Sequence, residues 1–176
     1  MIKVLLVDDH ELVRTGIRRI LEEAYDMDVV AEASNGDEAL RKAQQVQPDV
    51  VLMDLNMPGI GGIEATRRIV RSVPEAKVIA LTVLDDDPFP AKLNEAGAMG
   101  YLTKGCPADE MLQAIRMVSG GTPYVASSVA RKHMLADWQG TAATPFEELS
   151  SRVMQVALMI LHGQKTQEIS DGLCLS

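Results

Sequence analysis

The sequence predicts an α/β fold in which a five-stranded, doubly wound parallel sheet fills residues 1–120. Short runs of aliphatic and β-branched residues alternate there with stretches whose apolar residues recur at helical spacing. The short runs are apolar throughout, which is typical of parallel strands covered by helices on both faces. The 176 residues, of which 47% are hydrophobic, allow one such domain and a smaller second one. The expected strands are Lys3–Val7, Val29–Ala33, Val50–Met53, Lys77–Leu81 and Met99–Leu102.

Helices are expected between these strands and again near the end of the chain. Two groups of apolar residues each share one helical face. The first group comprises Val13, Ile17, Ile20, Leu21 and Ala24, and the second comprises Met111, Ile115 and Val118. Residues 120–123, Gly-Gly-Thr-Pro, end the second helix, and residues 121–148 are expected to form a partly helical linker. Residues 149–176 then carry a helix that starts near Ser150 and a shorter helix from about Thr166.

Charge and hydropathy exclude several classes of protein. The formal net charge is −8, and residues 1–120 carry 13 basic and 20 acidic side chains, so the basic excess typical of nucleic-acid binding is missing. No apolar run approaches the roughly 20 residues that span a bilayer, and we therefore expect a cytoplasmic protein with no membrane partner. Two cysteines and six aromatic residues make neither a disulfide framework nor a base-stacking surface.

Charged and polar side chains follow four of the five predicted strands at their carboxyl ends. Asp8 and Asp9 follow the first strand, Asp54 the third, Thr82 the fourth and Lys104 the fifth. Since ligands of open parallel sheets bind beyond this edge, we expect the five side chains to share one site. Three carboxylates require a cation, and oxygen ligands suit Mg²⁺, while an ammonium and a hydroxyl suit a small dianion. The pattern therefore favours phosphoryl transfer to a carboxylate, with an aspartate as nucleophile and an acyl phosphate as product.

Each of these residues also has a simpler interpretation when it is taken alone. Asp8 and Asp9 could serve as the N-cap of the next helix, and Asp54 could cap the turn that follows its strand. Thr82 is a common strand former, and Lys104 belongs to a residue type that is mostly solvated. Their occurrence at successive strand ends, in one order, is what favours a shared site.

Four segments carry a resemblance to a known family. They are Val-Asp-Asp-His (7–10), Met-Asp-Leu-Asn-Met-Pro-Gly (53–59), Ala-Leu-Thr (80–82) and Gly-Tyr-Leu-Thr-Lys (100–104). Together they resemble the receiver domain of two-component response regulators, which has a flavodoxin-like fold, over residues 1 to about 120. One departure is that Gly105 and Cys106 separate the lysine from Pro107, whereas the family usually has a proline closer to it.

The resemblance implies a role for each carboxylate. Asp54 would be the phosphoacceptor, and a sensor histidine kinase would donate the phosphoryl group. Mg²⁺ would be ligated by Asp9, by Asp54 and by the backbone carbonyl of Asn56. Asp8 would hold a metal-bound water.

The resemblance also implies a switch. Lys104 would pair with the phosphoryl oxygens, and Thr82 would hydrogen-bond to the phosphoryl group after transfer. Tyr101 matches the aromatic position that turns inward when Thr82 moves. A phosphoryl group adds a charge of about −2, which would shift the populations of two packings of this face.

Residues 149–176 resemble the first half of a LuxR-type helix-turn-helix domain. The resemblance is carried by Leu149-Ser150, Arg152, Gly163, Glu168-Ile169 and Leu173. With the receiver segments, the chain is identified as a member of the LuxR/NarL/FixJ family of response regulators. The recognition helix would follow Ser176, so DNA binding is implied only where the helix-turn-helix is complete, and a homodimer through the receiver is a further implied partner. Val153 stands where the family usually has a glutamate that completes a capping box.

The sequence thus predicts a phosphorylation-controlled response regulator that controls transcription as a full-length family member. It is not expected to be an enzyme beyond catalysing its own phosphorylation and dephosphorylation. An alternative is a truncated, receiver-only product that is phosphorylated without binding DNA. A remote alternative is a Mg²⁺-dependent phosphohydrolase with an aspartyl-phosphate intermediate, but such enzymes carry a second aspartate where this chain has Asn56.

Overall fold

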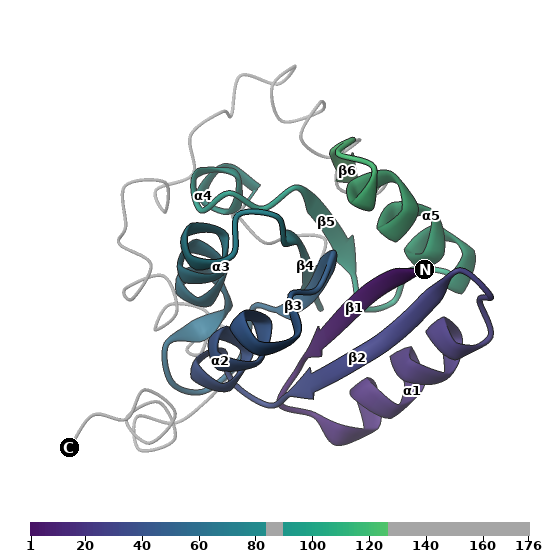
Figure 1. Ribbon diagram of the computed structural model, residues 1–176, viewed down its shortest axis with the longest axis horizontal. Helices are drawn as coiled ribbons and strands as arrows, with labels where there is room; N and C mark the ends of the chain where they lie inside the picture. Colours follow the sequence, from purple (N-terminus) through teal and green to yellow (C-terminus); the bar gives the residue numbers. More distant parts are fainter. Residues whose placement is uncertain (84–89, 127–176) are drawn as a thin grey trace.

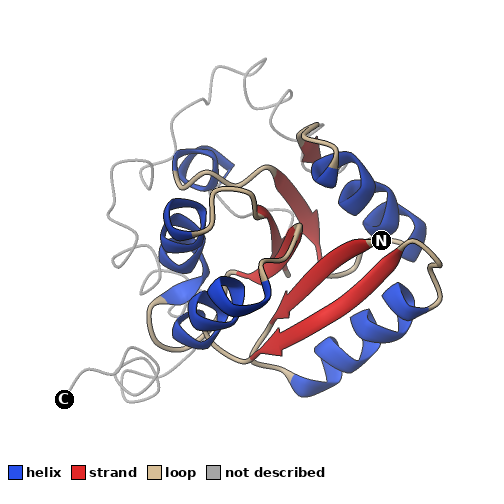
Figure 2. Cartoon of the chain, in the orientation of Figure 1, coloured by secondary structure: helices blue, strands red, loops and turns tan. Residues whose placement is uncertain are grey.

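The computed structural model describes residues 1–83 and 90–126, which form one sheet flanked by helices (Figure 1). Its strands are β1 Ile2–Val7, β2 Met27–Ala33, β3 Val50–Asp54, β4 Lys77–Thr82, β5 Gly100–Thr103 and β6 Tyr124–Val125. Its helices are α1 Glu11–Glu22, α2 Gly36–Val46, α3 Gly61–Ser72, α4 Pro90–Glu95 and α5 Ala108–Ser119. Strands and helices alternate from β1 to β6 (Figure 2). The predictions for residues 127–148 of the linker and for the helix-turn-helix segment 149–176 lie outside the described residues.

The sheet is doubly wound. Its strand order is β2-β1-β3-β4-β5-β6, and each neighbouring pair is parallel. Helices α1 and α5 cover one face, and α2 and α3 cover the other (Figure 1). The predicted α/β fold class is therefore confirmed. The strand order reverses between β1 and β3, and in such folds ligands bind beyond the carboxyl ends of the strands at this point.

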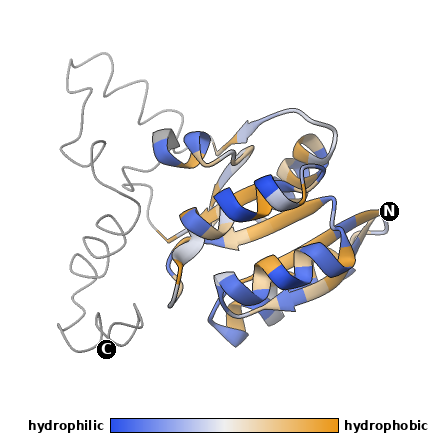
Figure 3. Cartoon of the chain, turned by 60° about the vertical axis from the view of Figure 1, so that its left-hand side comes forward, coloured by the Kyte–Doolittle hydropathy of each residue, from blue (hydrophilic) through white to orange (hydrophobic). Residues whose placement is uncertain are grey.

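The buried faces of the helices follow from their apolar spacing. Helix α1 buries Ile17 and Leu21, and α5 buries Met111, Ile115 and Val118. The strands between the helices are the most apolar part of the domain, and the outer helix surfaces are largely hydrophilic (Figure 3). The expected face of α5 is confirmed, and that of α1 only in part, because Val13 and Ile20 are half-buried and Ala24 follows the end of the helix. Within the described ranges, 1–83 and 90–126, no helix has the length and apolar character needed to cross a membrane.

The expectation of five strands is wrong, because the sheet has a sixth. Strand β6 pairs in parallel with β5, in a segment expected to begin the linker. The N–H of Tyr124 donates to the carbonyl of Met99 at 3.0 Å, and the N–H of Ala126 donates to that of Tyr101 at 2.9 Å. A two-residue strand is too short to show a period of two in the sequence. It forms because the edge of β5 offers backbone acceptors that would otherwise lack a partner.

Candidate functional site

Two aspartates lie opposite each other at the carboxyl edge of the sheet. Asp54 is the last residue of β3, and Asp8 directly follows β1. Val7 pairs with Met53 in the register of these two strands, so the next residue of each strand reaches the same edge. The exposed fraction is 0% for Asp54 and 2% for Asp8. Carboxylates buried this deeply require a compensating cation or a bound proton.

Lys104 supplies a cation to both aspartates. Its Nζ lies 2.7 Å from Oδ2 of Asp8 and 2.8 Å from Oδ2 of Asp54. The backbone N–H of Lys104 donates to the carbonyl of Thr82 at 2.6 Å, which ties the segment after β5 to the end of β4. Only 14% of the lysine side chain is exposed, so the simpler interpretation of a solvated lysine does not apply.

Burial dominates the electrostatics of Asp54. Removal from water raises the pKa of Asp54 to about 6, against the attraction of Lys104, and the negative charge of Asp8 adds to the rise. Burial lowers the pKa of Lys104, but the contacts with Asp54 and Asp8 outweigh it, so that pKa is raised above its ordinary value. At neutral pH the lysine is therefore protonated, and Asp54 is an ionised carboxylate that a further cation would stabilise.

The loop between β3 and α3 folds back over Asp54. The N–H of Asn56 donates to Oδ1 of Asp54 at 3.1 Å, so this carboxylate also caps the turn. Gly59 has a φ of 87°, a conformation that residues with a side chain rarely adopt. A Cβ at Gly62 would lie 2.1 Å from the carbonyl oxygen of Asp54. Only glycine therefore allows α3 to begin this close to the end of β3.

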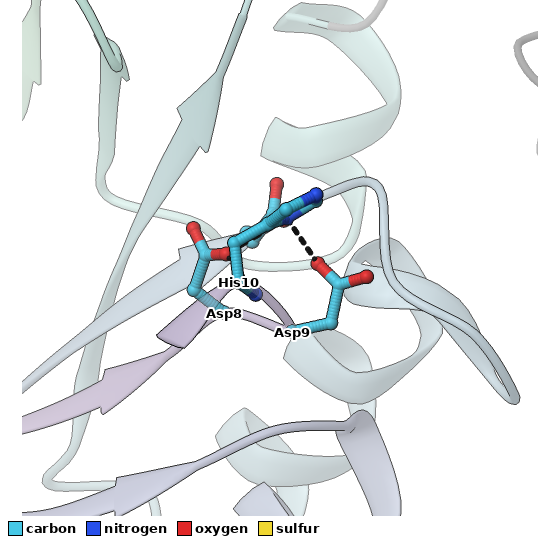
Figure 4. A group of neighbouring side chains, drawn as sticks. Asp8, Asp9 and His10 are labelled. Carbon is cyan, nitrogen blue, oxygen red and sulfur yellow. Dashed lines mark hydrogen bonds and ion pairs between the residues drawn. The ribbon is translucent and has the colours of Figure 1, made fainter. Parts of the chain in front are cut away.

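Asp9 and His10 form the outer rim of the site (Figure 4). Nδ1 of His10 lies 2.8 Å from Oδ1 of Asp9 and 3.4 Å from Oδ1 of Asp8. His10 is also the N-cap residue of α1, without a side-chain cap hydrogen bond, so neither aspartate serves as the N-cap. Sequence reasoning misses His10 as a site residue, since the only signal for it is its position after two aspartates.

The donor atoms of this edge are close enough together to share one metal ion. Ligand atoms of Asp8, Asp9, His10 and Asp54 all lie within 4.8 Å of one another. Three of the four groups are carboxylates, and hard oxygen ligands are those that Mg²⁺ prefers. Their combined negative charge exceeds the single positive charge of Lys104. The donor set therefore fits a hard divalent cation such as Mg²⁺.

The two remaining predicted site residues lie on β4 and β5. Thr82 is the last residue of β4 and is fully buried. Leu81 pairs with Asp54 in the register of β3 and β4, so Thr82 lies one residue beyond Asp54 toward the carboxyl edge. Tyr101 lies on β5, further back from this edge, and is 4% exposed. The cluster of Asp8, Asp54 and Lys104 thus has Thr82 on the adjoining strand end and Tyr101 deeper in the sheet.

Comparison with known proteins gives this site a family. Residues 4–116 match the response regulator receiver domain. The chain is 53% identical to response regulator GacA of Pseudomonas protegens over 176 residues, which cover all of this chain and 83% of GacA. The chain belongs to the response regulator family. It is also 52% identical to response regulator UvrY of Escherichia coli over 177 residues, covering all of this chain and 81% of UvrY.

A solved structure supports the same family assignment. The crystal structure of a LuxR-family two-component response regulator from Aurantimonas superposes with a TM-score of 0.75 at 38% identity. The match covers 78% of this chain and 99% of that one. The predicted resemblance to LuxR/NarL/FixJ response regulators is therefore confirmed, and the receiver fold positions the acidic edge described above.

Proposed function

We propose that this response regulator accepts a phosphoryl group on Asp54 from a sensor histidine kinase in the cytoplasm. The observation that carries the proposal is the contact of one ammonium, on Lys104, with the buried carboxylates of Asp54 and Asp8. The contact keeps an anionic nucleophile beside a cation in a site from which water is largely excluded. Positive charge placed where negative charge develops is the main means by which proteins promote phosphoryl transfer.

In the proposed reaction, a carboxylate oxygen of Asp54 attacks the phosphorus of a phosphohistidine. The P–N bond breaks, its electron pair stays on the imidazole nitrogen, and an acyl phosphate forms on the aspartate. Lys104 would pair with the transferred oxygens, and the hydroxyl of Thr82 would donate a hydrogen bond to one of them. The hydrogen bond from the Lys104 N–H to the Thr82 carbonyl keeps the two residues side by side, so that both could contact the transferred group.

The acidic rim supports a metal-assisted version of this reaction. Asp9, Asp54 and the backbone carbonyl of Asn56 would hold Mg²⁺ directly, and Asp8 would hold it through a water. When bound, the ion would offset charge on the phosphoryl oxygens. The phosphohydrolase alternative has less support, because Asn56 cannot act as the general acid that such an enzyme needs.

For the whole protein we propose control of transcription through DNA. Phosphorylation would shift the packing around Tyr101 on β5, and the receiver could also provide a homodimer contact. The truncated, receiver-only product is the second candidate, and it differs only in lacking DNA binding. A mobility-shift assay with promoter DNA, with and without phosphodonor, separates the two candidates.

The test of the phosphoacceptor uses a small phosphodonor with Mg²⁺ and intact mass spectrometry. The wild type should gain one acid-labile phosphoryl group, and Asp54→Ala should gain none. Asp28→Ala, which changes an exposed carboxylate on β2, is the matched control and should react like the wild type. Chelation of Mg²⁺ should stop the reaction. An Asp54→Ala protein that still gains one acid-labile phosphoryl group would refute the assignment.

A further inference from the structure

Arg14 joins the site to the neighbouring strand β2, although it lies on a helix outside the carboxylate cluster. From α1, its Nη1 donates to the backbone carbonyl of Asp8 at 2.7 Å. Its Nε donates to Oε2 of Glu32, on β2, at 3.1 Å. The guanidinium is thus held between a backbone oxygen of the site and a carboxylate of the neighbouring strand. With 16% of its side chain exposed, it is largely shielded from competing water.

The oxygen that Arg14 binds belongs to the peptide group between Asp8 and Asp9. Two other hydrogen bonds hold the same short segment: the N–H of Asp8 donates to the carbonyl of Ala33 at 3.1 Å, and the N–H of His10 donates to Oδ1 of Asp8 at 2.8 Å. Because the peptide group is planar, fixing its oxygen also fixes the direction in which Asp9 leaves it. Arg14 therefore acts on the backbone orientation of the buried Asp8 and of Asp9 on the rim.

Glu32 is a firm anchor for this contact. Its second carboxylate oxygen, Oε1, accepts from Nε of Arg18 at 2.5 Å, and its backbone carbonyl accepts from Nζ of Lys42. Burial raises the pKa of Glu32, but the hydrogen bonds from Arg18 and Arg14 outweigh it, so the carboxyl stays ionised at neutral pH. Two arginines thus share one carboxylate, and only Arg14 of this pair also reaches the site.

We propose that Arg14 is a positioning residue that orients the Asp8–Asp9 peptide group for cation binding, with Glu32 as its anchor. The proposal rests on the proposed function, since it assigns Arg14 a part in the same cation site. The guanidinium suits this role because its several N–H groups reach two acceptors on different elements, the Asp8 carbonyl and the Glu32 carboxylate. Residues that orient metal ligands from outside the ligand shell typically change metal affinity about 10–100-fold when they are replaced.

The chain provides a matched control in Arg18. Arg18 lies on the same helix as Arg14 and pairs with the same carboxylate of Glu32, but its other hydrogen bond is to Glu22 rather than to Asp8. Replacing Arg18 by alanine therefore removes an arginine–Glu32 pair and leaves the hydrogen bond to the Asp8 carbonyl in place. A difference between Arg14→Ala and Arg18→Ala isolates that one hydrogen bond.

The experiment is a Mg²⁺ titration of the full chain followed through amide NMR shifts. We expect Arg14→Ala to weaken Mg²⁺ binding about tenfold, and Arg18→Ala to change it less than about twofold. Arg14→Lys keeps the charge but cannot span both acceptors, so it should also bind Mg²⁺ more weakly than the wild type. Urea unfolding at saturating Mg²⁺ identifies any variant that fails to fold, in which case Arg14→Lys alone decides the comparison.

The outcomes separate this proposal from the proposed function. Equal Mg²⁺ affinities in folded Arg14→Ala and Arg18→Ala would overturn the role of Arg14, and so would wild-type affinity in Arg14→Lys. Neither result would affect the proposal that Asp54 is the phosphoacceptor. A wild type that binds no Mg²⁺ and gains no phosphoryl group overturns both. Selective weakening by the Arg14 variants, with a phosphorylation rate that recovers at high Mg²⁺, supports the positioning role.

Discussion

Replacing Asp54 by asparagine should stabilise the metal-free protein at neutral pH. The pKa of Asp54 is about 6 in the folded protein, against an ordinary value of 3.8. The folded state therefore binds this proton more tightly than the unfolded chain, and the free energy of unfolding falls as the pH rises from about 4 to above 6. The amide of Asp54→Asn has nearly the shape of the protonated acid and avoids this loss.

The size of the effect follows from the same shift. At 1.36 kcal/mol for each pKa unit, the difference in unfolding free energy between variant and wild type is about 3 kcal/mol at pH 7. At pH 5, where the folded carboxyl is mostly protonated, the difference should shrink to about half of this value. Asp54 is fully buried, so solvent does little to screen its charge.

Urea unfolding in the presence of a chelator, at pH 5, 6 and 7, measures this difference. Asp28→Asn, which neutralises an exposed carboxylate on β2, serves as the control and should show no comparable gain. Addition of Mg²⁺ should narrow the gap at pH 7, because the wild type binds the ion and the variant lacks one of its ligands. A variant that is less stable than the wild type at pH 7, or a gain that does not change between pH 5 and pH 7, would refute the reasoning.

Four further substitutions test the ion pairs of the site and the helices around it. Lys104→Met removes the ammonium between two buried carboxylates and should lower the free energy of unfolding at pH 7 by about 3 kcal/mol without metal. Urea curves with and without Mg²⁺ should show partial recovery, and equal stability of variant and wild type would contradict the ion pairs. Gly62→Ala forces a Cβ to 2.1 Å from the carbonyl oxygen of Asp54 and should destabilise by about 3 kcal/mol or more. Gly16→Ala, in open space on α1, should instead stabilise by about 0.5–1 kcal/mol, and thermal melts that rank the two glycine variants the other way would contradict the close approach of Gly62 to Asp54. Asn35→Ala removes the N-cap acceptor of α2 and should lower the free energy of unfolding by about 1 kcal/mol. Circular dichroism melts measure this loss, and an unchanged melting temperature would contradict it.

The sequence contains most of the information about the central strands. Strands β1, β3 and β4 are long enough to appear as unbroken apolar runs, and their observed ends differ from the predicted ends by one residue. β2 begins two residues earlier than predicted, because Asp28 interrupts the apolar run while its backbone still pairs with β1. β6 could not be predicted, since its two residues become a strand only by pairing with residues 24 positions earlier in the chain, Gly100 and Tyr101.

The sequence predicts which residues form the site, but not which of their atoms are in contact. Parallel strands bring their carboxyl ends to one edge, so the positions of Asp8, Asp54 and Lys104 along the chain suffice to group them. The contact of one ammonium with both carboxylates depends on the path of the segment after β5. The contacts of His10 and Arg14 likewise depend on how the turn after β1 folds, and sequence spacing does not encode this.

The parallel direction of β6 has a consequence for how signals leave this domain. Because β6 runs alongside β5, the chain at Ala126 is directed toward the same edge of the sheet as Asp54. The N–H of Ala126 bonds to the carbonyl of Tyr101, so the last residue of this segment lies beside β5, behind the edge that holds Asp54. A change in the packing of Tyr101 would therefore reach the end of this segment across one pair of neighbouring strands, without a relay through the rest of the sheet.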